Sequence, residues 1–199
     1  MVYLSDYFEI NESQIPTDLI DPAYRKATAN MIGAVDVCKK SISTLNEEEK
    51  KSLSFIVATH FGEVSSSLEF LTTLHDQKIA KPILFQNSLH NSTLGFASIQ
   101  LGLTGPAFTI SADKNTDQAV SKTAKSLLHL SDTVLICYVD IVPDFLKKNY
   151  GICFPEIEPH LGWARSFLIS KNNHHCNSPV PITLDNFIFS AFLKNQKKP

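Results

Sequence analysis

Three short apolar segments, separated by segments with helical periodicity, constrain the fold of this chain more than any other feature. Residues 52–60 (SLSFIVATH), 106–111 (PAFTIS) and 132–140 (DTVLICYVD) are rich in β-branched and aromatic residues, which indicates buried strands. Strands that alternate with helices are typical of α/β folds with parallel or mixed pairing. The length of 199 residues suits a single domain, so we predict one α/β domain over residues 1–199.

Apolar residues recur every three or four positions between these strands, as on the buried face of an amphipathic helix. The first predicted helix runs from Tyr24 to Ile42, and the polar sequence NEEEKKS after it is predicted to be a loop. Further helices are expected over residues 64–74, 89–101 and about 116–130, and Pro82 to Phe85 is expected to be a short extended link.

The pattern is weaker after Pro143. No regular element is predicted through NYGICFPEIEPHLGW, whereas residues 164–170 (ARSFLIS) are expected to form a strand. The sequence NNHHCNSPVP reads as a loop, and residues 182–193 (ITLDNFIFSAFL) are compatible with either a strand or a helix. The C-terminal part is therefore less well specified by pattern than the rest.

Charge and composition exclude some classes of partner as a default. The net charge of −2 favours neither nucleic acid nor an anionic membrane. The apolar run TVLICYV is too short to span a bilayer, and the N-terminus does not have the pattern of a signal peptide. Thirteen Phe residues favour a thick apolar core, a large apolar interface, or both. The four cysteines show no CxxC spacing, and the simple expectation is a reducing cytoplasm.

Standard catalytic and cofactor motifs are absent from the sequence. It contains no GxSxG elbow, no Gly-rich phosphate loop and no HExxH pair, and no cofactor is predicted. Five residues of metal-ligand type gather late in the chain: Cys153, His160, His174, His175 and Cys176. Their spacing matches no standard zinc site, so a solvated loop is the preferred interpretation and no metal is predicted.

The segment HNSTLGFASIQLGLTGPAFTIS, residues 90–111, resembles the β-ketoacyl synthases, the condensing enzymes of the thiolase fold. In that family a proline-led extended segment precedes an Asn, a spaced Gly, a Ser-Ile pair, a Gly, a Gly-Pro pair and a strand that leads to the active Cys. The matching residues are Pro82 to Phe85, Asn91, Gly95, Ser98-Ile99, Gly102 and Gly105-Pro106. The resemblance covers about residues 53–140 well and extends more loosely to both ends.

This resemblance implies a thiolase-like, layered α-β-α fold, and specifically a single, N-terminal-type half of the condensing-enzyme fold. The family's cysteine falls on Lys114, or on Asp113 after a shift of one residue, and neither is a plausible nucleophile for a thioester. The second half, which brings two basic site residues in the family, has no counterpart here. Residues that act as one catalytic unit leave no fractional activity when all are lost, so condensation by this chain alone is not expected.

Chain length factors are the known non-catalytic members of the family. The sequence resembles a short version of such a factor, of the kind associated with type II polyketide systems such as aryl polyene synthesis. The resemblance implies a heterodimer with a full-length ketosynthase, which supplies the catalytic residues and the contact with acyl carrier protein. It also implies a partner interface at Phe108, Thr109, Ile110, Ser111 and Asn91, and tunnel-gating residues Phe61, Val64, Leu68, Leu71, Phe85 and Leu89.

Two other functions stay open at this point. One is an acyl-thioester hydrolase that uses Asp113, His60 or His90, although the sequence shows no complete set of base and nucleophile. The other is a homodimeric acyl-binding protein of the same fold without a ketosynthase partner. The individual apolar residues named as gating residues could also be ordinary core residues.

Overall fold

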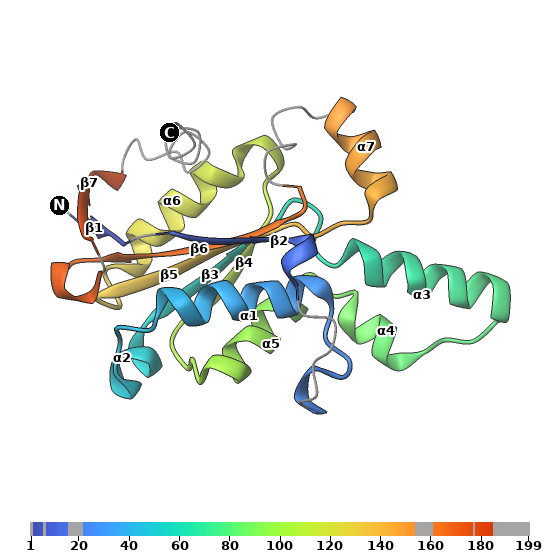
Figure 1. The fold of residues 1–199 in the computed structure, drawn as a ribbon, viewed down its shortest axis with the longest axis horizontal. Helices are drawn as coiled ribbons and strands as arrows, with labels where there is room; N and C mark the ends of the chain where they lie inside the picture. Colours follow the sequence, from blue (N-terminus) through green and yellow to red (C-terminus); the bar gives the residue numbers. More distant parts are fainter. Residues whose placement is uncertain (1, 6, 16–21, 154–160, 177, 185–199) are drawn as a thin grey trace.

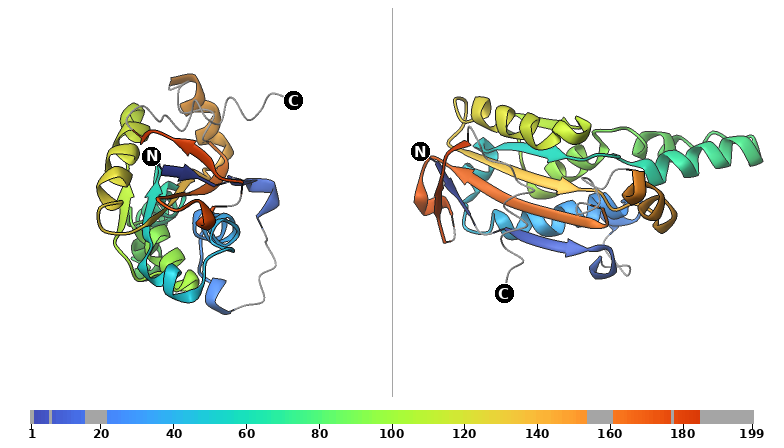
Figure 2. Two further views of the ribbon diagram at one scale, coloured as in Figure 1. Left: turned by 90° about the vertical axis from the view of Figure 1, so that its left-hand side faces the viewer. Right: turned by 90° about the horizontal axis from the view of Figure 1, so that it is seen from above.

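The computed structural model describes residues 2–5, 7–15, 22–153, 161–176 and 178–184. Its strands form one mixed sheet that lies between helices on both faces (Figures 1 and 2). The order across the sheet is β4-β3-β5-β6-β1-β7, and β2 also pairs with β6. The predicted α/β class with layered helices and mixed pairing is therefore confirmed.

Parallel and antiparallel strands occupy different parts of the sheet. The strands are β1 (Val2–Leu4), β2 (Phe8–Asn11), β3 (Ser54–Ala58), β4 (Ala107–Ile110), β5 (Thr133–Val139), β6 (Trp163–Ser170) and β7 (Val180–Ile182). β3 pairs in parallel with both β4 and β5, whereas all pairings that involve β6 or β1 are antiparallel. Every residue of β3 and β5 is buried, as their continuous apolar sequences predict.

Successive residues of the central strands face two separate apolar cores. Phe55 and Cys137 belong to the core beneath α1 (Ala29–Ser41) and α5 (Ser92–Leu101). Ile56 and Tyr138 belong to the core on the other face, which α6 (Thr116–Leu127) covers. Figure 1 shows α1 and α5 below the sheet and α6 above it. This arrangement is the predicted α-β-α layering.

Several helix boundaries differ from the sequence prediction. α1 begins at Ala29 rather than Tyr24, because the hydroxyl of Thr28 caps its first turn by accepting a hydrogen bond from the N–H of Met31 at 3.2 Å. The predicted loop NEEEKKS is instead a short helix, α2 (Glu47–Ser52). Asn46 and Glu49 form a reciprocal capping box there, which stabilises a helix that has no buried residue.

The predicted extended link at residues 82–85 is also wrong. This stretch starts helix α4 (Pro82–Asn87), with Pro82 in the first helical turn, where its missing N–H costs no hydrogen bond. α4 packs against α3 (Val64–Gln77), which projects beyond the edge of the sheet (Figures 1 and 2). The rings of Phe70 and Phe85 join the two helices, with centroids 5.7 Å apart.

The C-terminal part has more regular structure than its pattern predicted. Residues Asp144–Cys153 form helix α7, where no element was expected. The predicted loop NNHHCNSPVP contains a 3-10 turn at Asn173–His175 and the first two residues of β7, which ends at Ile182. The strand predicted at 164–170 is confirmed as β6. Most of the undecided segment 182–193 lies outside the described residues, as do residues 154–160. None of the described helices has the length and apolar character needed to cross a membrane.

Candidate functional site

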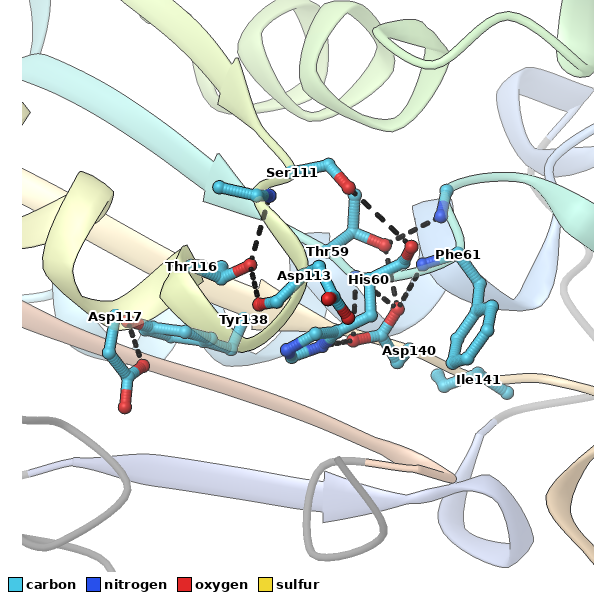
Figure 3. Close-up of polar contacts among 12 residues, drawn as sticks. Thr59, His60, Phe61, Ser111, Asp113, Thr116, Asp117, Tyr138, Asp140 and Ile141 are labelled. Atoms are coloured by element: carbon cyan, nitrogen blue, oxygen red, sulfur yellow. Dashed lines mark hydrogen bonds and ion pairs between the residues drawn. The ribbon is translucent and has the colours of Figure 1, made fainter. Parts of the chain in front are cut away.

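The candidate site lies where three parallel strands end at the same edge of the sheet. Residues 59–61 follow β3, residues 111–113 follow β4, and Asp140 follows β5 (Figure 3). Because β3, β4 and β5 run in the same direction, the turns after them meet. Ligand sites of open α/β sheets are commonly found outside the carboxyl ends of the strands. The polar contacts at this edge therefore define the site.

The carboxylate of Asp140 organises the turn after β3. It accepts hydrogen bonds from the Thr59 hydroxyl at 2.7 Å, from the His60 N–H at 2.9 Å and from the Phe61 N–H at 3.1 Å. The Nδ1 atom of His60 lies 2.7 Å from its second oxygen (Figure 3). The side chain of Asp140 is 1% exposed. A buried carboxylate is costly unless it is hydrogen-bonded or paired, and here both conditions are met.

His60 has its pKa raised above the ordinary value by this environment. Burial is the largest single effect and opposes it, because it disfavours the charged imidazolium. The hydrogen bond and the negative charge of Asp140, with smaller contributions from Asp117 and Asp113, outweigh burial. His60 is therefore held as the cationic member of a buried ion pair more readily than a solvated histidine would be.

The turn after β4 keeps the form of a strand-to-helix elbow. Asp113 has a φ of 50°, in the left-handed region that L-residues rarely adopt. The hydroxyl of Thr116 donates to the carbonyl of Asp113 at 2.7 Å and accepts from the N–H of Ala112 at 3.1 Å, which locks the turn just before α6 begins. Asp113 and Lys114 are both exposed. The elbow thus presents an acidic and a basic side chain at a helix N-terminus.

The glycines before β4 have clear structural reasons. Gly102 ends α5 with a φ of 67°, a conformation that glycine adopts without strain. A Cβ atom on Gly105 would lie 2.1 Å from the carbonyl oxygen of Leu53, at the start of β3. Only glycine can therefore approach β3 this closely, and the turn holds β4 in register beside it.

A second buried contact fixes α6 to the sheet beside the elbow. The hydroxyl of Tyr138, on β5, donates to Oδ1 of Asp117 at 2.8 Å (Figure 3). Burial, together with the adjacent Asp117 carboxylate, raises the pKa of Tyr138 well above its ordinary value. Tyr138 is therefore a neutral hydrogen-bond donor that positions the first turn of α6.

The described residues of this edge present no accessible hydroxyl paired with a base. The hydroxyl of Ser111, which is exposed, makes a long contact of 3.5 Å with the carbonyl oxygen of His60 rather than with its ring. The hydroxyls of Thr59 and Tyr138 do meet carboxylates, but both residues are buried. Acyl transfer needs a nucleophile positioned against a base, and this arrangement does not provide that pair.

The thiols of the described part of the chain are equally unsuited to nucleophilic chemistry. Cys38 and Cys137 are fully buried between the sheet and α1. Burial raises the pKa of Cys38 well above its ordinary value and raises the pKa of Cys176 to about 11. A thiol needs a lowered pKa to act as a nucleophile at neutral pH, so Cys38 and Cys176 are structural.

The residues predicted to form a partner interface lie at and beside the edge of the sheet. β4 is the terminal strand of the sheet order, so within the described chain one of its sides pairs with no strand. Phe108 is 47% exposed, Thr109 and Ile110 are half-buried, and Ser111 is exposed. Asn91 is exposed at the start of α5. Whether these residues contact a partner stays a prediction.

The six residues predicted to gate a tunnel lie on α3, on α4 and in the segments beside these helices, and they differ in exposure. Phe61, Val64 and Leu68 are half-buried, whereas Leu71, Phe85 and Leu89 are 58%, 55% and 44% exposed. A cavity of about 350 Å³ between the two helices is lined by other residues, among them Ser66 and Leu84. The gating role of the six predicted residues therefore remains a prediction that depends on a second chain.

Sequence reasoning named His60 and His90 but did not anticipate what surrounds them. The ring of His90 lies against Gly62, so close that a Cβ atom there would be 2.5 Å from its Nδ1 atom. Asp140 was not predicted as a site residue. The sequence did contain a signal for Asp140, because it is an acidic residue directly after the most apolar predicted strand. His60 occupies the same position at the end of another predicted strand. The parallel order of β3 and β5 turns that signal into a contact.

Comparisons with known proteins agree with this fold. Residues 13–186 match the family model for the N-terminal domain of β-ketoacyl synthase. Similar solved structures include a ketosynthase in complex with its chain length factor from Xenorhabdus doucetiae, with a TM-score of 0.66, 18% identity, and coverage of 86% of this chain and 80% of that chain. No curated protein matched the chain.

Two further structures share the fold. The ishigamide ketosynthase/chain length factor gives a TM-score of 0.64 at 13% identity, covering 79% of this chain and 48% of that one. A β-ketoacyl synthase from Burkholderia phymatum gives 0.61 at 12% identity, covering 80% and 46%. This chain thus spans about half the length of these two. The matches confirm the thiolase-like ketosynthase fold. Because the family model covers most of its length, the chain belongs to the β-ketoacyl synthase N-terminal domain family.

Proposed function

We propose that the chain is a non-catalytic chain length factor that pairs with a full-length ketosynthase and shapes its acyl tunnel. The observation that carries this proposal is the elbow after β4. The strand, the left-handed residue and the helix start are present, but the exposed side chains are those of Asp113 and Lys114. Whichever of the two residues takes the place of the family's cysteine, neither is a nucleophile for a thioester.

The free side of β4 supports a partner that adds to the sheet. An unpaired strand edge is a liability in a soluble protein, and a second strand removes it. Among the described residues, the hydroxyl of Thr109 is the buried side-chain oxygen without a hydrogen-bond partner. That oxygen is shielded by the chain's own atoms, so a strand of a neighbouring chain would pair with the outward backbone groups of β4 rather than with this hydroxyl.

Exposed apolar side chains are found on this strand and on the helices near it. They are Phe108 on β4, Ile99 on α5, Phe85 on α4 and Leu71 on α3, with exposures of 47%, 78%, 55% and 58%. Each of these elements contacts the next, from β4 through α5 and α4 to α3. Phe108 shares the face toward α6 with its register partner Ile56, whereas α5 covers the opposite face, so apolar side chains are exposed on both sides of the open edge. Side chains of this kind beside an open strand support a contact with a partner.

The comparisons support the choice of partner. Two of the similar structures contain a chain length factor by their own description. In the Xenorhabdus doucetiae complex the matched chain is close to this one in length, since the match covers similar shares of both. We therefore assign the chain to the short type of factor, acting with a ketosynthase and, through it, with acyl carrier protein. An aryl polyene or related type II polyketide system is the expected setting.

Co-expression with a full-length ketosynthase encoded by a neighbouring gene tests the proposal. Native mass spectrometry should show a complex with equal numbers of the two chains, and the factor expressed alone should be poorly soluble or self-associated. A stable monomer that binds no ketosynthase contradicts the proposal. A stable homodimer that binds acyl thioesters without a ketosynthase establishes the acyl-binding alternative instead.

Activity assays distinguish our proposal from the remaining alternative, an acyl-thioester hydrolase. Under our proposal the isolated chain does not turn over acyl thioesters, because the exposed elbow has no nucleophile with a base. Measurable hydrolysis that is abolished by Asp113→Asn or His60→Gln would establish the hydrolase function. The control is Asp36→Asn, which alters an exposed carboxylate on α1, outside this site.

A further inference from the structure

Three residues of metal-ligand type converge at the end of the sheet opposite the elbow. Glu49 lies on α2, and His174 and His175 form the 3-10 turn after β6. The carboxylate oxygen and the ring nitrogens that they offer all lie within 4.8 Å of one another. The sequence places Glu49 more than a hundred residues from the two histidines, so only the fold brings them together.

Hydrogen bonds hold His175 in one orientation. It is 8% exposed, and its Nδ1 atom lies 3.1 Å from the Thr133 hydroxyl and 3.0 Å from the Ser170 hydroxyl. Ser170 also accepts a hydrogen bond from the N–H of Asn172 at 3.1 Å and donates to the carbonyl of Asp132 at 3.3 Å. The Thr133 and Ser170 hydroxyls lie 3.2 Å apart, and a tautomer in which Nδ1–H of His175 donates to the Ser170 oxygen fits this set of contacts.

In this tautomer the lone pair of His175 is on Nε2, which faces the Glu49 carboxylate. The distance from Nε2 to Oε1 of Glu49 is 3.2 Å. Two ligands of a tetrahedral zinc ion, with bonds of about 2.0–2.1 Å, are separated by roughly 3.3 Å. The other carboxylate oxygen of Glu49 accepts from the N–H of Asn46 at 2.8 Å, which fixes the side chain. A ligating histidine whose second nitrogen is hydrogen-bonded, beside an oriented carboxylate, is the usual design of a metal site.

The third residue and the surroundings fit the same chemistry. His174 is exposed, and its ring lies edge-on to that of His175 with centroids 4.2 Å apart. Because it is at the surface, its side chain can move the short distance needed to complete a three-ligand set. Glu49 and His175 also line a cavity of about 560 Å³, which gives water access to a fourth position. Two imidazoles, a carboxylate and a water are a known zinc ligand set.

We infer that Glu49, His174 and His175 bind one Zn²⁺ ion, which ties the segment after β6 to α2. This differs from the cluster considered from the sequence. The Sγ atom of Cys176 contacts the carbonyl oxygen of Tyr3 at 3.7 Å, and His160 and the side chain of Cys153 lie outside the described part. The hydroxyl of Thr44 also donates to the carbonyl of His175 at 3.1 Å, so the turn is already held against the start of α2. The site does not depend on the proposed function.

Zinc binding by the full chain tests this inference. We expect one Zn²⁺ per chain after dialysis, a Co²⁺-substituted form with the absorption spectrum of a tetrahedral site, and a melting temperature raised by roughly 5–10 °C in excess zinc. Glu49→Gln keeps the capping contact to Asn46, since Gln serves in a capping box, but removes the anionic ligand. His174→Ala alters an exposed side chain. Each variant should weaken zinc binding at least about tenfold in competition with a chromophoric chelator.

The matched control is His75→Ala, which removes another exposed histidine that has a carboxylate neighbour, Asp76, but no second histidine beside it. Zinc binding that is absent from the wild-type chain, or unchanged in both Glu49→Gln and His174→Ala, overturns the inference and leaves a His175–Glu49 ion pair. If the chain is obtained only with a ketosynthase, the same variants are compared within that complex. If these tests show no zinc binding, the result on complex formation with the ketosynthase is unaffected.

Discussion

His60 and Asp140 stand at the ends of two neighbouring parallel strands, and Nδ1 of the histidine lies 2.7 Å from Oδ2 of the aspartate. The same carboxylate accepts hydrogen bonds from the hydroxyl of Thr59 and from two backbone N–H groups. One side chain therefore contacts all three residues of the turn after β3. This contact gives the site edge a fixed shape. The turn then leads directly into α3, which carries half of the predicted gating residues.

Replacing Asp140 should therefore cost the protein much of its stability. We expect Asp140→Asn to lower the free energy of unfolding by about 3 kcal/mol, because it breaks a buried pair and leaves donors without an acceptor. Asp36→Asn is the control, since Asp36 forms only an exposed pair with Lys40, at 2.6 Å, and should change stability by less than about 1 kcal/mol. Urea unfolding followed by circular dichroism measures both. Equal effects would contradict the assigned role of Asp140.

The raised pKa of His60 predicts a pH dependence with a definite sign. A histidine whose pKa is higher in the folded state binds its proton more tightly there. Its contribution to stability is complete below the unfolded value of about 6.5 and is lost as the pH rises through the folded value. We expect the stability difference between the wild type and His60→Gln to shrink from pH 6 to pH 9. Denaturant unfolding across that range measures it, and a difference that grows with pH would contradict the ion pair.

The main strands of the sheet were predictable from sequence because their signal is local. β3 and β5 are buried on both faces, so they read as continuous apolar runs. β1 and β2 carry no such signal, because they are short and pair with β6, more than 150 residues away. α2 has no buried residue, and α4 begins at a proline. Apolar periodicity could not find either helix, although the Asn46–Glu49 capping box was visible in the sequence.

The candidate site was predictable only in part, for the same reason. The elbow and its glycines form one continuous segment, so a motif could locate them. The contact of His60 with Asp140 joins residues 80 apart, and that of Glu49 with His175 joins residues still farther apart. Such contacts follow from the order and direction of the strands. A sequence pattern gives the candidates, but the sheet topology decides which of them meet.

The left-handed backbone at Asp113 predicts a selective cost of substitution. Asp113→Val should destabilise the chain by about 1–2 kcal/mol, because a β-branched residue resists a φ of 50°, whereas Asp113→Asn should be tolerated. Lys114→Val is the matched control, since the next residue has no positive φ. Thermal unfolding of the three variants tests the comparison. Similar losses for Asp113→Val and Lys114→Val would mean that the elbow is not strained at Asp113.

The edge strand offers a test of the interface that leaves the chain itself largely intact. The carbonyls of Pro106 and Ile110 accept from the N–H groups of Phe55 and Thr59, in β3 and directly after it. By alternation the backbone groups of Thr109 therefore point to the open side. Thr109→Pro removes an outward N–H, and we expect at least a tenfold loss of ketosynthase binding with little change in the fold. Thr109→Val is the control. It keeps that N–H and removes the unsatisfied hydroxyl, so it should bind normally. Equal binding by both variants would argue against strand pairing here.

The gating assignment is tested by product length in the complex with the ketosynthase. Leu68 is half-buried on α3, so Leu68→Trp should fill tunnel volume and shorten the product by roughly one or two extension units, since each excluded methylene forfeits about 0.8 kcal/mol of burial. Phe61→Ala should lengthen it. Leu130→Trp is the control, because Leu130 is 74% exposed just before β5, at the opposite end of the sheet. Mass spectrometry of the products reads the outcome. Unchanged length with Leu68→Trp in an intact, active complex would remove Leu68 from the tunnel wall.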